Sequence, residues 1–268
     1  MRAHGGASDD ARSSVPEFLE TGVPNLDRIV GGGLRSRSLA MVLGAPGAGK
    51  TMLAQQIAFH VAHQHKSVLY LTGYSETHDK LLANSRGLSF FDAAAVGREI
   101  QFLNLVDLLH EGAEETEAAL VGEARAHAAQ FLILDGFRSI RRFLDNDQDV
   151  AHFLYSLGAK LSVLGVTTLL CLEGDPLTSS HEPELTVCDA ILFLRREVRG
   201  SHERRLLEAG QGYGAQHPCP ASTPTPLHAT ASRYIPVGNQ SSTPGMCRGA
   251  TRGCRSVFLV WIPSLGAG

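Results

Sequence analysis

The sequence predicts an α/β protein in which a mostly parallel sheet is covered by helices on both faces. Short continuous apolar runs recur along the chain, amphipathic helical patterns separate them, and several runs end in glycine or an acidic residue. Such runs are typical of strands buried on both faces, and their alternation with helices is typical of parallel sheets. The 268 residues, of which 43% are hydrophobic, suffice for one large domain of this class.

Charge and cysteine content restrict the function only weakly. The net charge of −3 does not indicate nucleic-acid or membrane binding. The five cysteines include no C-x-x-C pair, so a disulfide framework is not expected, and Cys171 and Cys188 lie in apolar runs typical of the core. No apolar run approaches about 18 residues and no apolar leader is present, so we expect a cytoplasmic protein.

The chain begins with two distinct segments. Residues 1–16 are rich in Gly, Ser, Asp and Arg and are predicted to be disordered. Residues 21–34 contain a short helical turn, with Leu26, Ile29 and Val30 on one side, and then three glycines. These glycines lead into the first strand.

The first strand, residues 39–44, is followed by a glycine-rich loop and then by a helical pattern. The loop reads G-x-x-x-x-G-K-T, the phosphate-binding loop, in the strand–loop–helix context that the motif requires. The alternative is a glycine-rich turn that only happens to precede a helix, but the complete motif and both flanks favour a nucleoside triphosphate site. The residues expected to bind the nucleotide are Gly44, Ala45, Pro46, Gly47, Ala48, Gly49, Lys50, Thr51 and Met52.

The residue types in this loop follow from the chemistry of phosphate binding. Glycines let backbone N–H groups turn toward phosphate oxygens, and the unpaired N–H groups at a helix start favour an anion. Lys50 is expected to reach the β- and γ-phosphates, and the hydroxyl of Thr51 to hold Mg²⁺.

The rest of the predicted domain alternates between strands and helices. Helices are expected at residues 79–86, 114–129 and 148–164, the last with apolar residues at a 3.6-residue spacing. Two antiparallel strands, 190–194 and 203–208, are expected to be joined by a charged turn near residue 200. The remaining strands are predicted at residues 67–72, 100–105, 131–135 and 166–172.

Carboxylates follow several of these strands, at the sheet edge where ligands bind in parallel α/β folds. Asp135 ends a buried strand, as in a Walker B motif, and is expected to hold Mg²⁺ through its water shell opposite Thr51; the alternative is a cap. Glu76 is a candidate to orient the attacking water, the alternative being an ordinary glutamate at the start of the following helix. For Glu173, a role near the γ-phosphate and a purely structural role remain open.

Taken together, the motifs resemble the KaiC-type branch of the RecA-like ATPases over about residues 17–208. The resemblance rests on the Thr-Gly-aliphatic-Pro-x-aliphatic-Asp turn before Gly-Gly-Gly-Leu in residues 21–34, the phosphate loop, the strand ending at Asp135 and the segment 165–170. It implies a RecA-like P-loop NTPase core with a C-terminal antiparallel hairpin. It also implies ATP and Mg²⁺ as cofactors, ATP hydrolysis, and a ring or filament of identical subunits with nucleotide at their boundaries.

Two departures from that family concern catalysis. Where the family has a Glu-Glu pair that activates water, this chain has Ser75 and Glu76, so the resemblance assigns the water to Glu76 and implies slow hydrolysis. Where the family continues its last hairpin into Lys-x-Arg-Gly, which reaches the neighbouring nucleotide, this chain reads Leu-Glu-Ala-Gly at residues 207–210. The resemblance therefore assigns no Lys-Arg pair at this place in the chain.

The segment 211–268 differs in composition from the domain, which we place at residues 17–210. It contains no Asp or Glu and is dominated by Pro, Ser, Thr and Ala, so low order is expected. An out-of-frame C-terminus that begins near position 209 is one hypothesis, and a natural disordered tail is the alternative. The histidines and cysteines of this segment match no common zinc spacing.

The sequence therefore predicts a regulatory or signalling ATPase, with Lys50 and Glu76 in catalysis. One alternative is a nucleotide-binding module with little turnover. A third is a RadA-like, DNA-dependent recombinase ATPase, although no concentrated basic patch with aromatic residues supports DNA binding.

Overall fold

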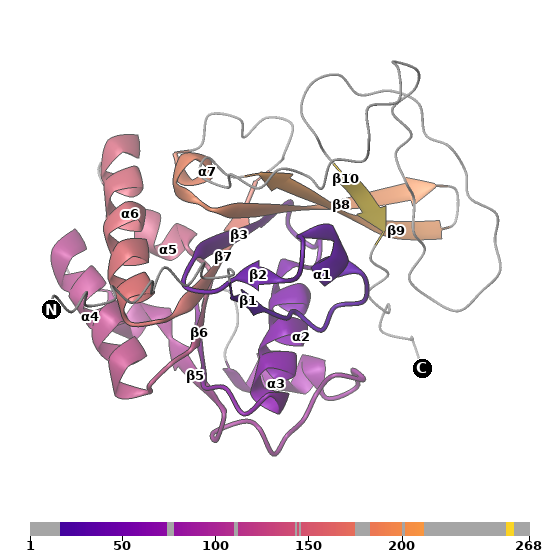
Figure 1. Cartoon of the computed structure of the whole chain (residues 1–268), viewed down its shortest axis with the longest axis horizontal. Coiled ribbons are helices and arrows are strands. Elements are labelled where there is room, and N and C mark those ends of the chain that lie inside the picture. Colours follow the sequence, from indigo (N-terminus) through magenta and orange to yellow (C-terminus); the bar gives the residue numbers. More distant parts are fainter. Residues whose placement is uncertain are drawn as a thin grey trace, which may run out of the picture.

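The computed structural model describes residues 17–73, 78–109, 112–142, 144, 146–174, 183–199, 202–211 and 256–259. Within these residues the main sheet has eight strands in the order β10-β9-β8-β3-β7-β6-β4-β5 (Figure 1). The strands from β8 to β5 run parallel, whereas β9 and β10 are antiparallel to their neighbours. The predicted α/β class with a C-terminal hairpin is confirmed. The strands are β3 Leu39–Gly44, β4 Val68–Thr72, β5 Ile100–Asn104, β6 Phe131–Asp135, β7 Thr167–Glu173, β8 Ala190–Arg199, β9 His202–Gln211 and β10 Ser256–Leu259.

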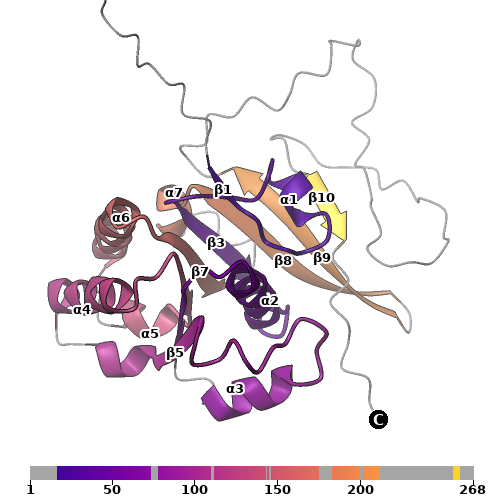
Figure 2. The ribbon, with the colours of Figure 1, turned by 60° about the horizontal axis from the view of Figure 1, so that its bottom comes forward.

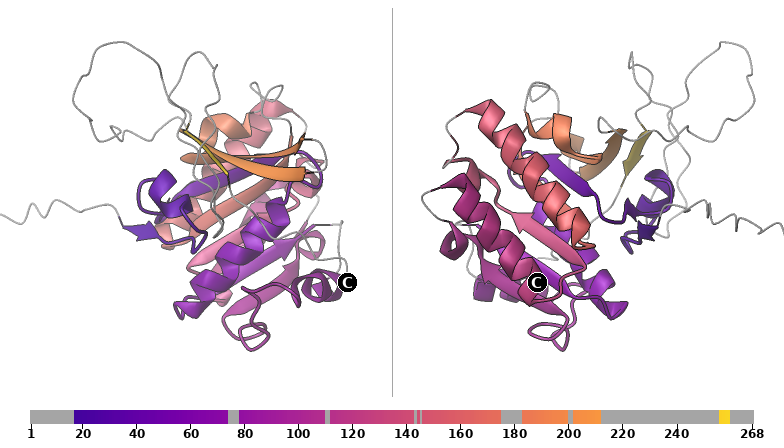
Figure 3. Two further views of the ribbon diagram at one scale, coloured as in Figure 1. Left: turned by 90° about the vertical axis from the view of Figure 1, so that its right-hand side faces the viewer. Right: turned by 60° about the vertical axis from the view of Figure 1, so that its left-hand side comes forward.

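Helices cover both faces of this sheet, as the two views in Figure 3 show. On one face Leu53 and Ile57 of α2 pack with Val42 and Ile133 of the strands. On the other face α4 and α6 pack on alternate residues of the same strands. The buried strands are therefore apolar on both sides, as their continuous apolar runs indicate. The helices are α1 Leu26–Ile29, α2 Lys50–His63, α3 His78–Ser85, α4 Ala113–Ala126, α5 Arg138–Arg141, α6 Asp147–Val163 and α7 Glu184–Val187.

Most predicted bounds agree with the structure to within about three residues, and the differences have local causes. The strand expected at residues 100–105 ends at Asn104, whose side chain accepts a hydrogen bond from the backbone N–H of Val106 and starts the 3₁₀ helix η1, Leu105–Leu108. The predicted hairpin is longer, since β8 and β9 pair along their whole length and form the long ribbon in Figure 2. Helices α5 and α7, each of four residues, are short additions to the elements predicted above.

In the segment 211–268, for which low order is predicted, the structure describes Gln211 and Ser256–Leu259. The latter form β10 and pair with β9, with Phe258 opposite Leu207. The hypothesis that these residues include an out-of-frame tail stays a prediction.

Residues 21–34 form the turn that the sequence predicted, and two of its polar residues, Thr21 and Asp27, hold it together. The backbone N–H and hydroxyl of Thr21 both donate to Oδ1 of Asp27, at 2.9 and 2.7 Å. Around this contact β1 Phe18–Leu19 and β2 Leu34–Arg35 form a two-stranded antiparallel sheet that was not predicted. Leu19 and Leu34 are buried in the same cluster as α2, so the segment packs on that helix.

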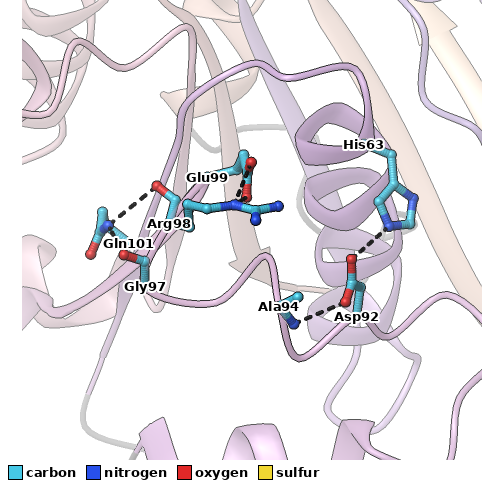
Figure 4. Close-up of polar contacts among 7 residues, drawn as sticks. All are labelled: His63, Asp92, Ala94, Gly97, Arg98, Glu99 and Gln101. Carbon is cyan, nitrogen blue, oxygen red and sulfur yellow. Dashed lines mark hydrogen bonds and ion pairs between the residues drawn. The ribbon is translucent and has the colours of Figure 1, made fainter.

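The far end of α2 contacts the loop that precedes β5. Figure 4 shows Asp92 of this loop between His63 of α2, 3.4 Å away, and the backbone N–H of Ala94, 2.9 Å away. In addition Phe90 and Phe91 lie against Phe59, with ring centroids 5.9 and 5.2 Å apart. The helix is thereby fixed at its C-terminal end, opposite the end that follows the phosphate loop.

Two expectations about composition can be compared with the described part of the chain. Cys171 and Cys188 are buried and free, as predicted for core cysteines. Among the described residues no helix combines the length and apolarity that crossing a bilayer requires.

Candidate functional site

The phosphate loop lies between the buried strand β3 and the first turn of α2. Gly47 and Gly49 adopt positive φ angles of 74° and 105°, a conformation that side-chain-bearing residues rarely adopt. The backbone N–H of Ala48 donates to Ala45 O at 3.1 Å and closes the turn. The first turn of α2 contains no acidic residue. Its unpaired backbone N–H groups therefore offer a positive end to an anion.

The exposure of the loop residues decreases from the outer to the inner part of the loop, as expected for a loop that binds an anion. Ala45, Pro46 and Gly47 are exposed, whereas Ala48 is buried; Thr51 and Met52 are half-buried. The outer loop is thus open to a ligand, while the inner loop is packed on the sheet.

Lys50 begins α2 and points back across the loop. Its Nζ donates to the carbonyl oxygens of Gly44 and Ala45, at 2.9 and 3.1 Å. Burial lowers the pKa of Lys50, while the nearby charge of Glu173 acts in the opposite direction. Asp135 also raises this pKa, to a smaller degree. The two carboxylates that end β7 and β6 are therefore close enough to act on the ammonium group.

Asp135 lies at the end of β6, opposite Thr72 of β4 and Cys171 of β7 in the strand register. Its Oδ2 accepts a hydrogen bond of 2.9 Å from the hydroxyl of Tyr70. Gly136 follows with a φ of 114°, and a Cβ there would lie 2.9 Å from Gly73 Cα, so the loops after β4 and β6 touch through their backbones. This close contact fixes the strand end that bears the carboxylate.

Glu173 ends β7 directly opposite Gly44, the first glycine of the loop. Arg138 of α5 approaches it, with Nη1 3.6 Å from Glu173 Oε2 and Nη2 3.4 Å from Glu173 O. The sequence analysis did not single out Arg138. Its position three residues after Asp135, at the same edge of the sheet, is the signal that could have identified it.

Tyr70 is the second residue that the sequence analysis missed. It lies two positions before the end of β4, and its side chain is fully buried. A tyrosine within an apolar strand is a signal, because a buried phenolic hydroxyl generally needs a hydrogen-bond partner.

Cys171 lies beneath this site as an inert core residue. Burial raises its thiol pKa well above the ordinary value, and Asp135 raises it further. A thiol of this kind stays protonated and is not a nucleophile at neutral pH.

The structure thus brings together the phosphate loop, Lys50, Asp135 and Glu173. The other predicted acid, Glu76, lies outside the described residues, in the gap 74–77. In the described ranges no group of three or more His, Cys, Asp or Glu side chains gathers in a metal-binding cluster. The two residues predicted to hold Mg²⁺, Thr51 and Asp135, would supply only two oxygen donors, a number that suits an ion that keeps most of its water.

Comparison with known proteins identifies the family. The family model of the KaiC ATPase matches residues 19–217. The chain belongs to the KaiC ATPase family. The resemblance inferred from the motifs is therefore confirmed, and it extends over both the phosphate loop and the β8–β9 hairpin.

Two relatives match different lengths of this chain. The circadian clock protein KaiC3 of Synechocystis is 25% identical over 224 residues, which is 78% of this chain and 43% of the relative. The DNA repair protein RadA of Mycolicibacterium smegmatis is 47% identical over 59 residues, 22% of this chain and 13% of that protein. The chain therefore spans less than half the length of these relatives.

A solved structure has the same fold. It is that of a KaiC-like protein from the hyperthermophilic archaeon Pyrococcus horikoshii, with a TM-score of 0.63 and 19% sequence identity. The match covers 76% of this chain and 92% of the other. The fold of this KaiC family member is thus a RecA-like one.

Proposed function

We propose that this KaiC family member binds ATP with Mg²⁺ at the loop Gly44–Thr51 and hydrolyses it. The observation that carries the proposal is the complete phosphate loop at the carboxyl edge of the sheet, with Lys50 held across it by two carbonyl oxygens. A phosphate oxygen is a stronger partner for an ammonium group than a neutral carbonyl oxygen, because both partners are then charged. Lys50 would therefore exchange these contacts for the β- and γ-phosphates.

The same edge offers groups for the metal and for the water. Thr51 and Asp135 would hold Mg²⁺, which supplies charge stabilisation to the phosphates when bound. Glu76 would orient the attacking water, a role that rests on the family resemblance and on its place after β4. A single acid there supports slow turnover.

Assembly and location belong to the same proposal. The family resemblance supports a ring or filament of identical subunits with nucleotide at their boundaries. A protein that uses ATP and Mg²⁺ needs a compartment that contains both, which supports a cytoplasmic location. A regulatory or signalling role fits slow hydrolysis better than a metabolic one.

The first experiment measures nucleotide binding by isothermal titration calorimetry. The parent should bind Mg²⁺-ATP, and Lys50→Ala should weaken binding by about 100-fold or more, because charge-assisted contacts to two phosphates are lost. Lys80→Ala is the matched control, since Lys80 is an exposed lysine of α3. Undiminished affinity in Lys50→Ala would refute the proposal.

A second candidate function is a DNA-dependent ATPase, favoured by the local similarity to RadA over 59 residues. A third is a nucleotide-binding module that turns over little ATP, favoured by the single acid at Glu76. Steady-state turnover with and without single-stranded DNA, together with the native mass, separates them. Stimulation by DNA indicates the second function, and binding with negligible turnover indicates the third.

A further inference from the structure

The ion pair between Arg138 and Glu173 joins two elements at the carboxyl edge of the sheet. The pair connects α5 with the end of β7 through two contacts, of 3.6 and 3.4 Å. Both side chains are accessible, with 64% of Arg138 and 37% of Glu173 exposed. An exposed pair of this kind adds little to folding stability, so stability does not account for its position.

The pair lies beside the phosphate loop. Glu173 is opposite Gly44 in the strand register, and the backbone N–H of Gly174 donates to Gly44 O at 3.2 Å. The charge of Arg138 also reaches Lys50, whose pKa it lowers while Glu173 raises it. The guanidinium therefore lies on the phosphate side of the sheet edge, close to the cation that the motif itself supplies.

We propose that Arg138 binds the terminal phosphate of the nucleotide from within the same chain, and that Glu173 holds its guanidinium until the nucleotide binds. The inference rests on the proposed function. Guanidinium groups bind phosphate through paired N–H donors, and Arg138 keeps enough exposure to turn from Glu173 toward a ligand. The exchange is favourable because a terminal phosphate carries more charge than one carboxylate.

This arrangement predicts selectivity between ATP and ADP. Only the triphosphate has the terminal group that Arg138 reaches, so loss of the guanidinium should weaken ATP binding and leave ADP binding unchanged. Glu173 has the opposite effect, since it competes with the phosphate for the guanidinium of Arg138. Its neutralisation should strengthen ATP binding only while Arg138 is present.

The test measures affinities for Mg²⁺-ADP and for a non-hydrolysable Mg²⁺-ATP analogue by calorimetry. Arg138→Ala should weaken binding of the analogue about tenfold, the value of one charge-assisted contact, and change ADP binding less than about twofold. Arg125→Ala is the control, because Arg125 is an exposed arginine on α4. Circular dichroism should show Arg138→Ala folded like the parent, as expected for an exposed side chain.

A double-mutant cycle with Glu173→Gln completes the test. Glu173→Gln should tighten analogue binding about threefold in the parent, a modest gain from removing one competing charge, and should have no effect in Arg138→Ala. If Arg138→Ala keeps the parent's ratio of analogue to ADP affinity, the role of Arg138 is refuted while nucleotide binding stands. A parent that binds neither nucleotide refutes the proposed function instead.

Discussion

The hydroxyl of Tyr70 donates a hydrogen bond of 2.9 Å to Oδ2 of Asp135, across the neighbouring strands β4 and β6. Tyr70 is fully buried, and its ring lies 5.0 Å from that of Phe102 on β5. A residue of the core thus sets the direction of the carboxylate that we propose as a ligand of Mg²⁺. The same contact links sheet packing to the chemistry of the site.

Tyr70→Phe should weaken Mg²⁺ binding at the site without changing the shape of the core. Loss of the hydroxyl should raise the Mg²⁺ concentration for half-maximal ATP turnover about tenfold, the usual effect of removing a group that orients a ligand. The free energy of unfolding should fall by about 1 kcal/mol. Tyr155→Phe is the control, since Tyr155 is 70% exposed on α6. An unchanged Mg²⁺ requirement would show that Tyr70 does not orient the ligand.

Asp135→Asn should separate nucleotide binding from metal binding. A neutral amide is a poorer magnesium ligand than a carboxylate, so the gain in ATP affinity on adding Mg²⁺ should shrink by about tenfold or more. Binding of metal-free ATP should persist, because the loop itself is intact. Calorimetry with and without Mg²⁺ measures both quantities. Asp92→Asn serves as the control, because Asp92 contacts the far end of α2. Equal effects of the two variants would contradict the assignment of Asp135 as a Mg²⁺ ligand.

The ion pair of Arg141 and Glu184 should be important for stability rather than for binding. Arg141 Nη1 lies 2.6 Å from Glu184 Oε1, and the side chain of Glu184 is fully buried. Arg141→Met removes this ion pair from a buried carboxylate and should lower the free energy of unfolding by about 3 kcal/mol in urea denaturation. Adding Glu184→Gln should restore at least about 1 kcal/mol, because the buried charge is then gone. A double variant that is no more stable than Arg141→Met would be evidence against this explanation.

The buried Cys188 predicts how stability falls at alkaline pH. Burial raises its thiol pKa far above the ordinary value, so above about pH 9 the thiol ionises only in the unfolded chain. The unfolded state then binds fewer protons than the folded state, and stability declines with rising pH. Cys188→Ala should remove up to about 1.4 kcal/mol of that decline per pH unit, compared with the parent in urea denaturation at several pH values. Parallel curves for parent and variant would show that this thiol does not contribute.

The phosphate loop and Asp135 could be predicted because their signals are local. A strand, a glycine turn and Lys-Thr at a helix start occupy one continuous segment, and the acid ends a single apolar run. Both signals depend on backbone conformation and on residue type, so they do not require knowledge of the neighbouring strands. The two-stranded β1–β2 sheet was missed because each strand has only two residues, too few for a periodic pattern.

The contacts of Tyr70 and Arg138 could not be predicted in the same way. They join residues that are 65 and 35 positions from their partners. Each depends on β6 lying between β4 and β7, an order that apolar runs do not specify. Long-range side-chain contacts of this kind also require particular rotamers, which follow from packing.

The amino-acid order alone predicted the class of fold and the glycine-rich loop, because helix and strand periodicity and a contiguous motif depend only on neighbours in the sequence. The family followed from the resemblance of these motifs to known ones. The tertiary structure determined which carboxylate lies beside which cation. Strand order placed Glu173 opposite Gly44, and a buried tyrosine turned Asp135. Those pairings result from close packing among distant segments, where shape and burial select one arrangement.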